Sequence, residues 1–378
     1  MKRIIAITAF DYFSSGALTL LIPLLLLDRH LNVADIGIVL STMPLVFLVA
    51  RLLFAAFADQ IGWAHVFVLL NWPATFFSSL IYYFAKSIPI FSVGKIVEGL
   101  RDSAYWAVNR TAIFSLSPHS KEKEATRINA VIWIATAVGS GVAGIGIAFL
   151  GFSTTLAILI VASSMMGIPA LMLWKTKSVN SQQKALAASA ISSLNPRGRD
   201  RGFWGVSIAL FFYSLATYPL VTLLLPVFMQ QRLGYSYLTI GVAFLAYNLV
   251  AALVTLGALR KRLGIKRVIV QSAIGLFATF LLASSGSGFY FLALFIALAV
   301  TRGLGIGFFE SIIVKATKNK PAVSVDIGWL HAPTRLAEFA SVLYAGFIAQ
   351  SLGYIPVFAT SGIFFAIFSA TSLYILKN

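Results

Sequence analysis

The stretch KIVEGLRDSAYWAVNR, residues 95–110, places acidic and basic side chains inside a longer run, from about residue 88 to 114, that is otherwise apolar enough to cross a membrane. Its charged residues are Lys95, Glu98, Arg101, Asp102 and Arg110. A carboxylate in apolar surroundings holds a proton more tightly, and a cationic neighbour weakens that hold. Such a group can alternate between a proton and a partner, so the chemistry to expect is ion pairing and proton exchange.

The spacing of these residues puts most of them on one side of a helix, at about 100° per residue. The shared face holds Lys95, Glu98, Asp102, Tyr105 and Asn109, with Arg101 and Arg110 on its two flanks. We expect this face to line a cavity or to pack on the first helix of the chain.

Further charges interrupt other apolar segments, namely Asp11, Arg51, Arg302, Glu310, Arg335 and Glu338. Insertion scales put a charge at a helix centre at about 2.5 to 3.5 kcal/mol, so such residues face the protein interior or water and find partners. Depth along the helices predicts that Asp11 contacts Arg110, with Arg51 as the competing cation.

In the second half, Arg302 and Glu338 lie at a similar depth, and Glu310 and Arg335 lie together nearer the cytoplasmic side. Two crossed pairs between the helices that carry them are therefore expected. The candidates for proton coupling are Asp11 first and Glu310 second, followed by Glu98 and Asp102. The alternative for each of these residues is an ion pair that only fixes helix packing.

The elements that must position these charges are membrane helices. Of the 378 residues, 59% are hydrophobic and 11% charged, and the mean hydropathy is +0.89, whereas a soluble domain is about half apolar and a quarter charged. Segments of about 20 apolar residues are long enough to cross a bilayer. They recur at 4–27, 36–58, 64–85, 88–114, 127–150, 153–174, 203–229, 237–259, 266–286, 288–314, 327–350 and 354–376. The sequence predicts an all-α polytopic membrane protein with twelve spans.

The net charge of +17 is distributed as a topology signal. Basic residues concentrate in the loops on the side of the N-terminus, and the opposite loops hold only Arg29, Lys86 and Arg232. By the positive-inside rule both termini are expected on the cytoplasmic side. The expected location is the plasma or inner membrane of the cell. A nucleic-acid partner is not expected, because no basic soluble domain rich in aromatics is present, whereas contact with membrane lipids is.

The chain repeats itself at an offset of about 200 residues. The matching pairs are Pro23 and Pro226, Gly37 and Gly241, Gly62 and Gly264, Gly99 and Gly303, and Gly151 and Gly353. We expect an N-terminal six-helix bundle at 1–174, a polar cytoplasmic linker at 175–202 and a C-terminal six-helix bundle at 203–378. In transporters of this plan the solute site lies between the halves, which rock to give alternating access.

Three motifs resemble those of the major facilitator superfamily. AAFADQIGWAHV at 55–66 is similar to its G-x-x-x-D-R-x-G-R-R loop and keeps Asp59 and Gly62, while GALRKRLGIKR at 257–267 has Lys261 in place of the aspartate and keeps Gly264. KIVEGLRDSAYW resembles the R-x-x-Q-G-x-G pattern of helix 4. The resemblance implies a monomer in which these two loops gate the cytoplasmic side and helices 1, 4, 7 and 10 line the cavity.

The cavity-lining helices then supply the candidates for solute binding. These are Arg101, Arg110, Tyr105, Trp106, Asn109, Arg302, Tyr213 and Phe309, while Arg51, Arg335 and Glu338 are expected to form ion pairs. The aromatic members offer stacking faces for a flat solute, although core packing is an alternative role for each.

These features predict a secondary transporter that moves a small organic solute, by proton-coupled efflux (antiport). AVGSGVAGIG at 137–146 resembles the antiporter motif of helix 5, with Val142 in place of its proline, but its glycines also suit close helix packing. The alternatives are a uniporter or symporter of an organic anion, and a lipid or lysolipid flippase.

An enzyme is not expected, because the histidines are scattered and neither H-E-x-x-H nor G-x-S-x-G occurs. No metal or cofactor is expected, and without cysteine thiolate sites are excluded.

Overall fold

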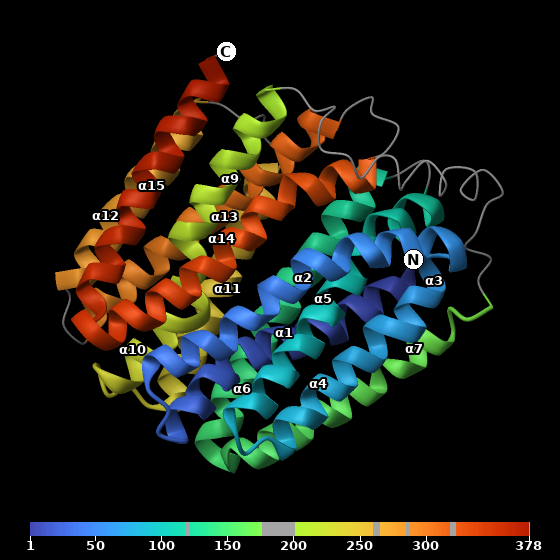
Figure 1. Ribbon diagram of the computed structural model, residues 1–378, viewed down its shortest axis with the longest axis horizontal. Coiled ribbons are helices and arrows are strands. Elements are labelled where there is room, and N and C mark those ends of the chain that lie inside the picture. Colours follow the sequence, from blue (N-terminus) through green and yellow to red (C-terminus); the bar gives the residue numbers. More distant parts are fainter. Residues whose placement is uncertain (118–120, 176–200, 260–264, 285–287, 318–322, 378) are drawn as a thin grey trace.

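The computed structural model describes residues 1–117, 121–175, 201–259, 265–284, 288–317 and 323–377, and within them it contains helices and no strand. The first half comprises α1 (Lys2–Asp28), α2 (Val33–Ile61), α3 (Trp63–Val66), η1 (Phe67–Asn71), α4 (Trp72–Phe84), α5 (Ile88–Leu116), α6 (Lys121–Met165) and α7 (Gly167–Leu171). The second half comprises α9 (Arg201–Pro219), η3 (Leu220–Leu224), α10 (Leu225–Gln231), α11 (Tyr237–Leu259), α12 (Ile265–Ser284), α13 (Phe289–Thr317), α14 (Val323–Leu352) and α15 (Tyr354–Lys377). Figure 1 shows them as two adjoining groups of long helices.

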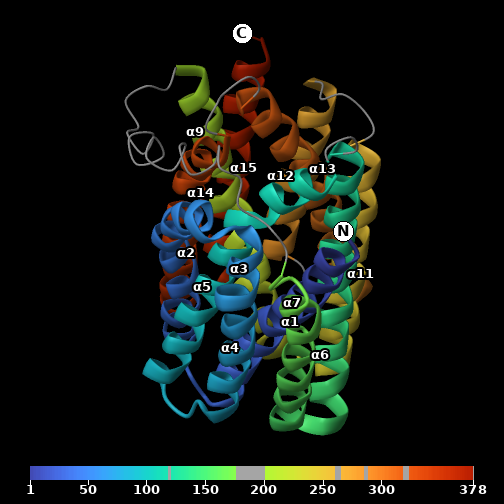
Figure 2. The same ribbon diagram turned by 90° about the vertical axis from the view of Figure 1, so that its right-hand side faces the viewer.

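Helix occupies every one of the twelve predicted spans, so the all-helical fold is confirmed. The third span is built from α3, η1 and α4, and the seventh from α9, η3 and α10, where η1 and η3 are single π-helical turns. The fifth and sixth spans are the two legs of α6, which reverses at Gly151. The long helices run beside one another in the view of Figure 2.

The reversal within α6 depends on a glycine. Gly151 has φ 77° and ψ 172°, a backbone conformation that side chains other than glycine rarely adopt. Gly353, between α14 and α15, has φ 86°. The repeat that pairs these two glycines in the sequence therefore corresponds to the same turn in both halves.

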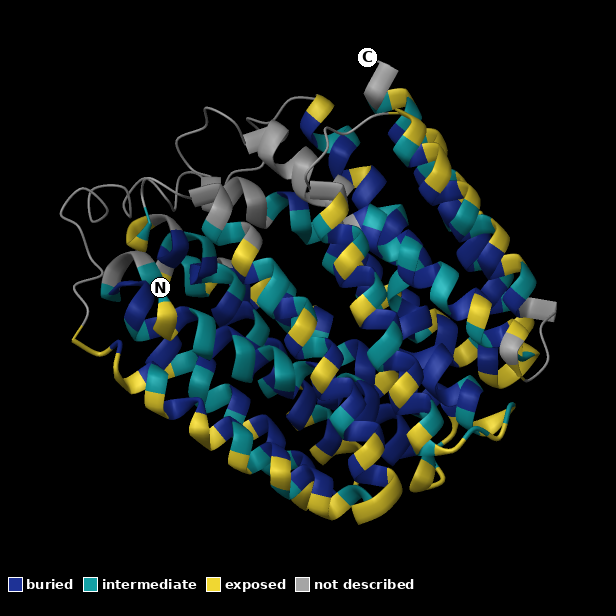
Figure 3. Ribbon diagram, turned by 180° about the vertical axis from the view of Figure 1, so that it is seen from behind, coloured by how far each residue is buried: buried dark blue, intermediate teal, exposed yellow. Residues whose placement is uncertain are grey.

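Hydropathy alone identifies most of the long helices as able to cross a membrane. Eight helical stretches in the described ranges are long and apolar enough, one of them being both legs of α6. The charge-bearing α5 and α14 are not among them, and the described apolar part of α13, Tyr290–Gly305, is shorter than a full span. Figure 3 shows exposed positions along the outward faces of the helices and buried positions where helices meet.

The two halves meet through a pair of glycine contacts that follow the internal repeat. Gly37 on α2 lies against Gly346 on α14, and Gly144 on α6 lies against Gly241 on α11. Gly241 is the repeat partner of Gly37, and Gly346 is that of Gly144 at an offset of 202 residues. A two-fold operation that exchanges the halves therefore exchanges the two contacts, as expected for a self-complementary interface.

Both glycine contacts lie on the side of the molecule opposite the chain termini. One apolar core there joins residues of both halves, including Leu21, Leu24, Leu224 and Phe295. Toward the side of the termini the cores are separate, one formed only by the first half and one only by the second. Among the described buried residues, the halves thus share one apolar core on one side and have separate cores on the other.

Replacing Gly241 by alanine should force α6 and α11 apart, because the added Cβ meets the Cα of Gly144 and overpacking of this kind costs about 1 to 3 kcal/mol. The chain has no cysteine, so spin labels can be attached to Phe149→Cys and Leu238→Cys, two exposed positions near this contact. We expect their distance distribution to shift to longer values.

The matched control is Gly257→Ala on the same helix, where an added Cβ meets nothing within 4 Å. A Gly241→Ala distribution identical to those of the control and of the unsubstituted chain would contradict this account of the interface.

Candidate functional site

A cavity of about 350 Å³ lies between the two halves. Residues of α1, α2, α5 and α6 line it from the first half, and residues of α9, η3, α11, α13 and α14 from the second. The helices that the resemblance assigned to the cavity, α1, α5, α9 and α13, all contribute. The cavity is the one place in the described structure where the predicted solute-binding residues of both halves come together.

A buried charge network lies behind the cavity wall of the first half. Arg101, which is 0% exposed, contacts Asp102 through Nη2 at 2.6 Å and through Nε at 3.1 Å. Its Nε lies 3.7 Å from Asp11, its Nη2 lies 3.8 Å from Glu98, and Nη2 also donates to Ser15 at 3.1 Å. One guanidinium therefore links three carboxylates and both α1 and α5.

Glu98 has further partners at the far end of the network. Lys95 and the hydroxyl of Tyr82 each donate to its Oε2 at 2.8 Å. The Lys95 ammonium also lies 5.8 Å from the centre of the Tyr82 ring. Glu98 thus accepts from two donors on this side and has Arg101 on the other.

Asp11 depends on polar side chains from the third span. Thr75 donates to its Oδ1 at 3.0 Å, and Asn71 does so at 3.5 Å. Asn71 ends the π-helical turn η1, and its amide also donates to the carbonyl of Arg101 at 3.3 Å. Insertions of this kind in a helix re-aim a side chain and recur at functional sites.

The charges of the network do not balance. Three carboxylates, those of Asp11, Glu98 and Asp102, share two cations, Lys95 and Arg101. Within these ion pairs one carboxylate therefore has no cation of its own, and Asp102 also interacts electrostatically with Arg335 across the cavity. Asp102 and Lys95 line the cavity while Asp11 is 1% exposed, so Asp102 is the network carboxylate that reaches the cavity.

The remaining cavity charges are mostly positive. The basic residues that line it are Arg51, Lys95, Arg110, Arg302 and Arg335, and the acidic ones are Asp102 and Glu338. Arg335 pairs with Glu338 at 2.6 Å within α14. Among the described side chains, no carboxylate lies within ion-pair distance of Arg51 or Arg302.

Aromatic rings support the two arginines that lack a carboxylate. The Arg302 guanidinium lies 5.2 Å from the Trp133 ring and 5.7 Å from the Tyr247 ring, which come from opposite halves. The guanidinium of Arg51 lies 5.6 Å from the ring of Phe47, and that of Arg335 lies 3.8 Å from the same ring. Such contacts stabilise a guanidinium without neutralising it, so its charge remains for an anion.

Three predicted contacts differ in the structure. Asp11 lies beside Arg101 rather than Arg110, because Arg101, about two and a half turns earlier on α5, is on the side that faces α1. The predicted pair of Arg302 with Glu338 is wrong, because Glu338 pairs with Arg335 along one helix at a spacing of three residues. The predicted pair of Glu310 with Arg335 involves a side chain outside the description and stays a prediction. Arg51 does not act as an ion-pair partner within the described structure, because it packs on Phe47 instead.

The predicted polar face of α5 is divided between two environments. Lys95, Asp102, Trp106 and Arg110 line the cavity, with Tyr213 and Arg302 opposite. Tyr105 and Asn109 are buried, and the hydroxyl of Tyr105 lies 3.0 Å from that of Thr8 on α1.

Several predicted residues lie outside the description. The side chains of Asp59, Phe309 and Glu310 are not described, although their backbones belong to α2 and α13, and Lys261 and Gly264 lie outside the described residues altogether. Gly62 ends α2 with φ 92°. The proposed gating loops stay a prediction.

Sequence reasoning missed the residues that complete the site. Asn71, Thr75 and Tyr82 hold the network, and Trp133 and Tyr247 hold Arg302. The signal for the first two was a pair of polar residues, Asn71 and Thr75, one helical turn apart in an apolar span.

Comparison with known proteins agrees with this architecture. Residues 4–319 match the family model described as Major Facilitator Superfamily. A sequence comparison with curated proteins finds no match.

Three solved structures share the fold. The human organic anion transporter MFSD10 (TETRAN) is 17% identical to this chain with a TM-score of 0.71, and the match covers 98% of this chain and 99% of the transporter. The nucleoside transporter NupG is 12% identical with a TM-score of 0.74, covering 100% of this chain and 98% of NupG. A bacterial homolog to the human lysosomal transporter Spinster, inward-facing and occupied, is 12% identical with a TM-score of 0.76, covering 99% of this chain and 96% of the homolog.

Arg101→Gln should destabilise the first half strongly, because it leaves three carboxylates against Lys95 alone. Breaking a buried ion pair by removing one partner typically costs about 3 to 5 kcal/mol. Adding Asp102→Asn leaves two carboxylates against Lys95, the same surplus of one carboxylate as in the unsubstituted network. The double variant should therefore recover part of the lost stability. The measurement is the thermal unfolding temperature of the purified protein.

Arg232→Gln, an exposed arginine of the second half, is the control and should unfold like the unsubstituted protein. An Arg101→Gln variant as stable as this control, or a double variant no more stable than Arg101→Gln alone, would refute the role given to Arg101.

Proposed function

Because the chain belongs to the Major Facilitator Superfamily, a family of membrane transporters and not of enzymes, we propose that it carries a small organic anion across the membrane by alternating access. The observation that carries the proposal is the charge of the cavity, where five basic residues face two acidic ones. Lys95 is already paired with Glu98 and Arg335 with Glu338, whereas no described carboxylate lies within ion-pair distance of Arg51 or Arg302, which contact aromatic rings. An anion would supply the missing partner.

The chemistry of the lining narrows the class of anion. Arginine presents a planar fork of donors that suits a carboxylate or a phosphate. Trp106 and Trp133 of the first half and Tyr213 and Phe244 of the second also line the cavity and offer apolar ring faces. We infer a solute with one or two anionic groups on a flat or aromatic body. An organic anion transporter is among the proteins with this fold, so the fold accommodates a solute of this class.

The surplus carboxylate of the network is the proposed coupling site, with Asp11 as the group that exchanges the proton. Protonation removes a negative charge close to the cavity and so raises its positive potential. A bound proton and a bound anion then favour each other, and by linkage each raises the affinity for the other. Mutual attraction of this kind supports symport of proton and anion, one of the alternatives that the sequence left open.

Proton-coupled efflux by antiport stays the competing proposal. It requires proton and solute to exclude each other, as they would if a cationic group of the solute bound at Asp102. The glycines of the antiporter-like run do not favour it, because Gly139 packs on α1 and Gly144 on α11. Their observed contacts fit the close-packing role.

Alternating access would use the asymmetry between the two sides of the molecule. The bundles proposed at 1–174 and 203–378 would rock about the interface that contains the paired glycine contacts, while the segment 175–202 connects them. If the positive-inside rule holds, the joined side faces outward and the separate cores face the cytoplasm. The described conformation is then the inward-facing one, and the opposite conformation must break the Gly144 and Gly241 contact.

Solute class is tested by loading purified protein into liposomes and adding organic anions, organic cations, neutral sugars or lysolipids outside. We expect uptake of anions only. Arg302→Gln should weaken the apparent affinity for the anion about tenfold or more, since a hydrogen bond to a charged group contributes about 1.5 to 3 kcal/mol. Arg232→Gln is the control and should leave affinity unchanged. Uptake of cations or sugars alone, or an Arg302→Gln variant with unchanged affinity, would overturn the proposal.

Coupling is tested in the same liposomes with a pH-sensitive dye inside. Symport predicts that the lumen acidifies as anion enters, whereas antiport predicts that it becomes alkaline, and both hold for either orientation of the protein. Asp11→Asn should abolish the proton movement, because the asparagine cannot exchange a proton. Asp28→Asn at the exposed end of the same helix is the matched control. Proton movement that persists in Asp11→Asn would exclude Asp11 as the coupling group.

A further inference from the structure

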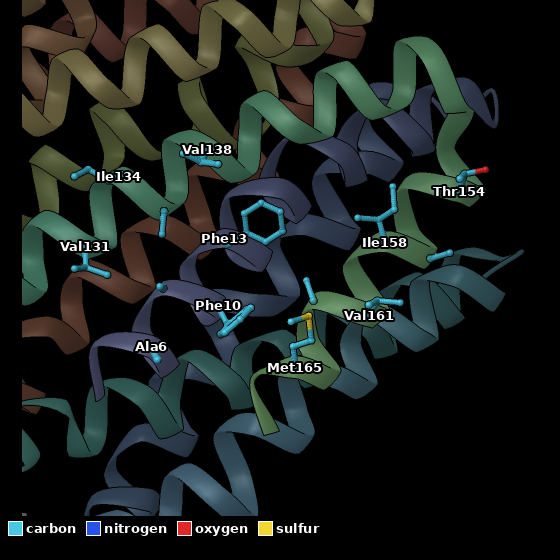
Figure 4. Close-up of a pocket in the computed structure, with 14 residues that line it drawn as sticks. Ala6, Phe10, Phe13, Val131, Ile134, Val138, Thr154, Ile158, Val161 and Met165 are labelled. Atoms are coloured by element: carbon cyan, nitrogen blue, oxygen red, sulfur yellow. The ribbon is translucent and has the colours of Figure 1, made fainter. Parts of the chain in front are cut away.

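A second hollow lies on the outer face of the first half, away from the central cavity. Its volume is about 940 Å³, and the two legs of α6 form its walls while α1 forms its floor. Figure 4 shows Phe10 and Phe13 of α1 between Ile134 on one leg and Val161 on the other. We call this hollow the α1–α6 groove. Its lining is apolar apart from Thr154.

The groove faces the lipid and not the protein interior. Val161 is 60% exposed, Ile134 50% and Met165 49%, and all three belong to helical stretches that can cross a membrane. The second leg lines the groove from Thr154 to Met165. These twelve residues of helix span about 16 Å from first to last, which is about half of the hydrocarbon thickness of a bilayer. The groove thus matches the length of an acyl chain in one leaflet.

Close helix contacts separate the groove from the central cavity. A Cβ on Gly139 would meet the carbonyl oxygen of Phe13, and a Cβ on Gly16 would meet that of Thr136. The opposite faces of the same helices line the cavity, through Tyr12 and Thr136 among others. A molecule in the groove therefore occupies a site of its own and not a lateral entrance to the cavity.

Basic residues gather at one end of the groove only. On α1, Lys2 lies one turn before Ala6, and on α6, Arg127 lies one turn before Val131, so each continues the stripe that lines the groove. Arg127 is 60% exposed, and its Nη1 lies 3.9 Å from Glu124 on the same helix. At the same end, the Nη1 of Arg3 on α1 donates to the carbonyl of Met172, which follows the second leg of α6, at 2.8 Å. The other end, near Thr154, has no charged residue in the segment 149–165.

We propose that the α1–α6 groove binds one anionic phospholipid. Its acyl chain lies along Phe10 and Phe13, and its phosphate lies at the end formed by Lys2 and Arg127. Charge complementarity selects the headgroup, because a basic residue near the membrane surface attracts anionic lipid by about fivefold in affinity. Since Asp11 lies between Phe10 and Phe13 on α1, the lipid would brace the helix that carries the proposed coupling residue.

The test is native mass spectrometry of the delipidated protein, offered equal amounts of phosphatidylglycerol and phosphatidylcholine with identical chains. We expect one phosphatidylglycerol to remain bound, with a preference of about fivefold or more. The double variant Lys2→Gln and Arg127→Gln should lose this preference, and Lys266→Gln, an exposed basic residue of the second half, should keep it. Ala157→Phe fills the groove without changing charge and should lower the retention of phosphatidylglycerol.

Each variant is first checked for an unchanged thermal unfolding temperature in lipid-free detergent. Glycerol phosphate, which lacks acyl chains, should fail to compete even in large excess, and effective competition would mean that the site takes a free phosphate group. Equal binding of the two lipids, or a preference that survives both the double variant and Ala157→Phe, would overturn the proposal. Neither result depends on whether the protein transports an anion.

Discussion

A guanidinium without any contact to solvent, that of Arg101, determines how the first half is built. It links Asp11 on α1 to Glu98 and Asp102 on α5, and only Glu98 has a second cation, Lys95, among the described ion pairs. Thr75 donates to the Asp11 oxygen that Arg101 also approaches, and Tyr82 donates to the Glu98 oxygen that Arg101 does not approach. Two helices and the third span are thereby held in one arrangement by charge rather than by apolar packing alone.

The imbalance of this network connects structure to function. With one carboxylate in surplus, the neutral state of the network requires a proton, and Asp102 joins the network to the cavity wall. The cavity itself has the opposite imbalance, since Arg51 and Arg302 face it without carboxylate partners in the described structure. A proton on one side and an anion on the other would each remove an electrostatic cost. The proposal of coupled binding rests on these two facts.

Much of the fold could be predicted from the sequence, and the reason is physical. A bilayer requires spans of a fixed minimum length, so apolar runs reveal the helices, and the repeated glycines reveal the relation of the halves. Gly151 and Gly353 mark equivalent turns, and Gly37 and Gly241 mark equivalent contacts.

The pairing within the site was less predictable. Helical periodicity placed Arg101 on a flank of α5, but which acid it contacts depends on the rotation of α1 and on the π-helical turn that brings Asn71 inward. Both are tertiary features that periodicity does not encode. Likewise, Arg335 and Glu338 are three residues apart on one helix, a spacing that permits a local pair without requiring it.

The most direct test of the account is the proton balance of anion binding in the purified protein, without transport. The protein is kept in weakly buffered detergent with a pH indicator, and an anion of the class that the liposome assay selects is added in increments. The account predicts that protons are taken up as the anion binds, and that the medium becomes more alkaline until the sites are filled. Release of protons on binding would contradict it, because proton and anion would then exclude each other and the surplus carboxylate could not favour the anion.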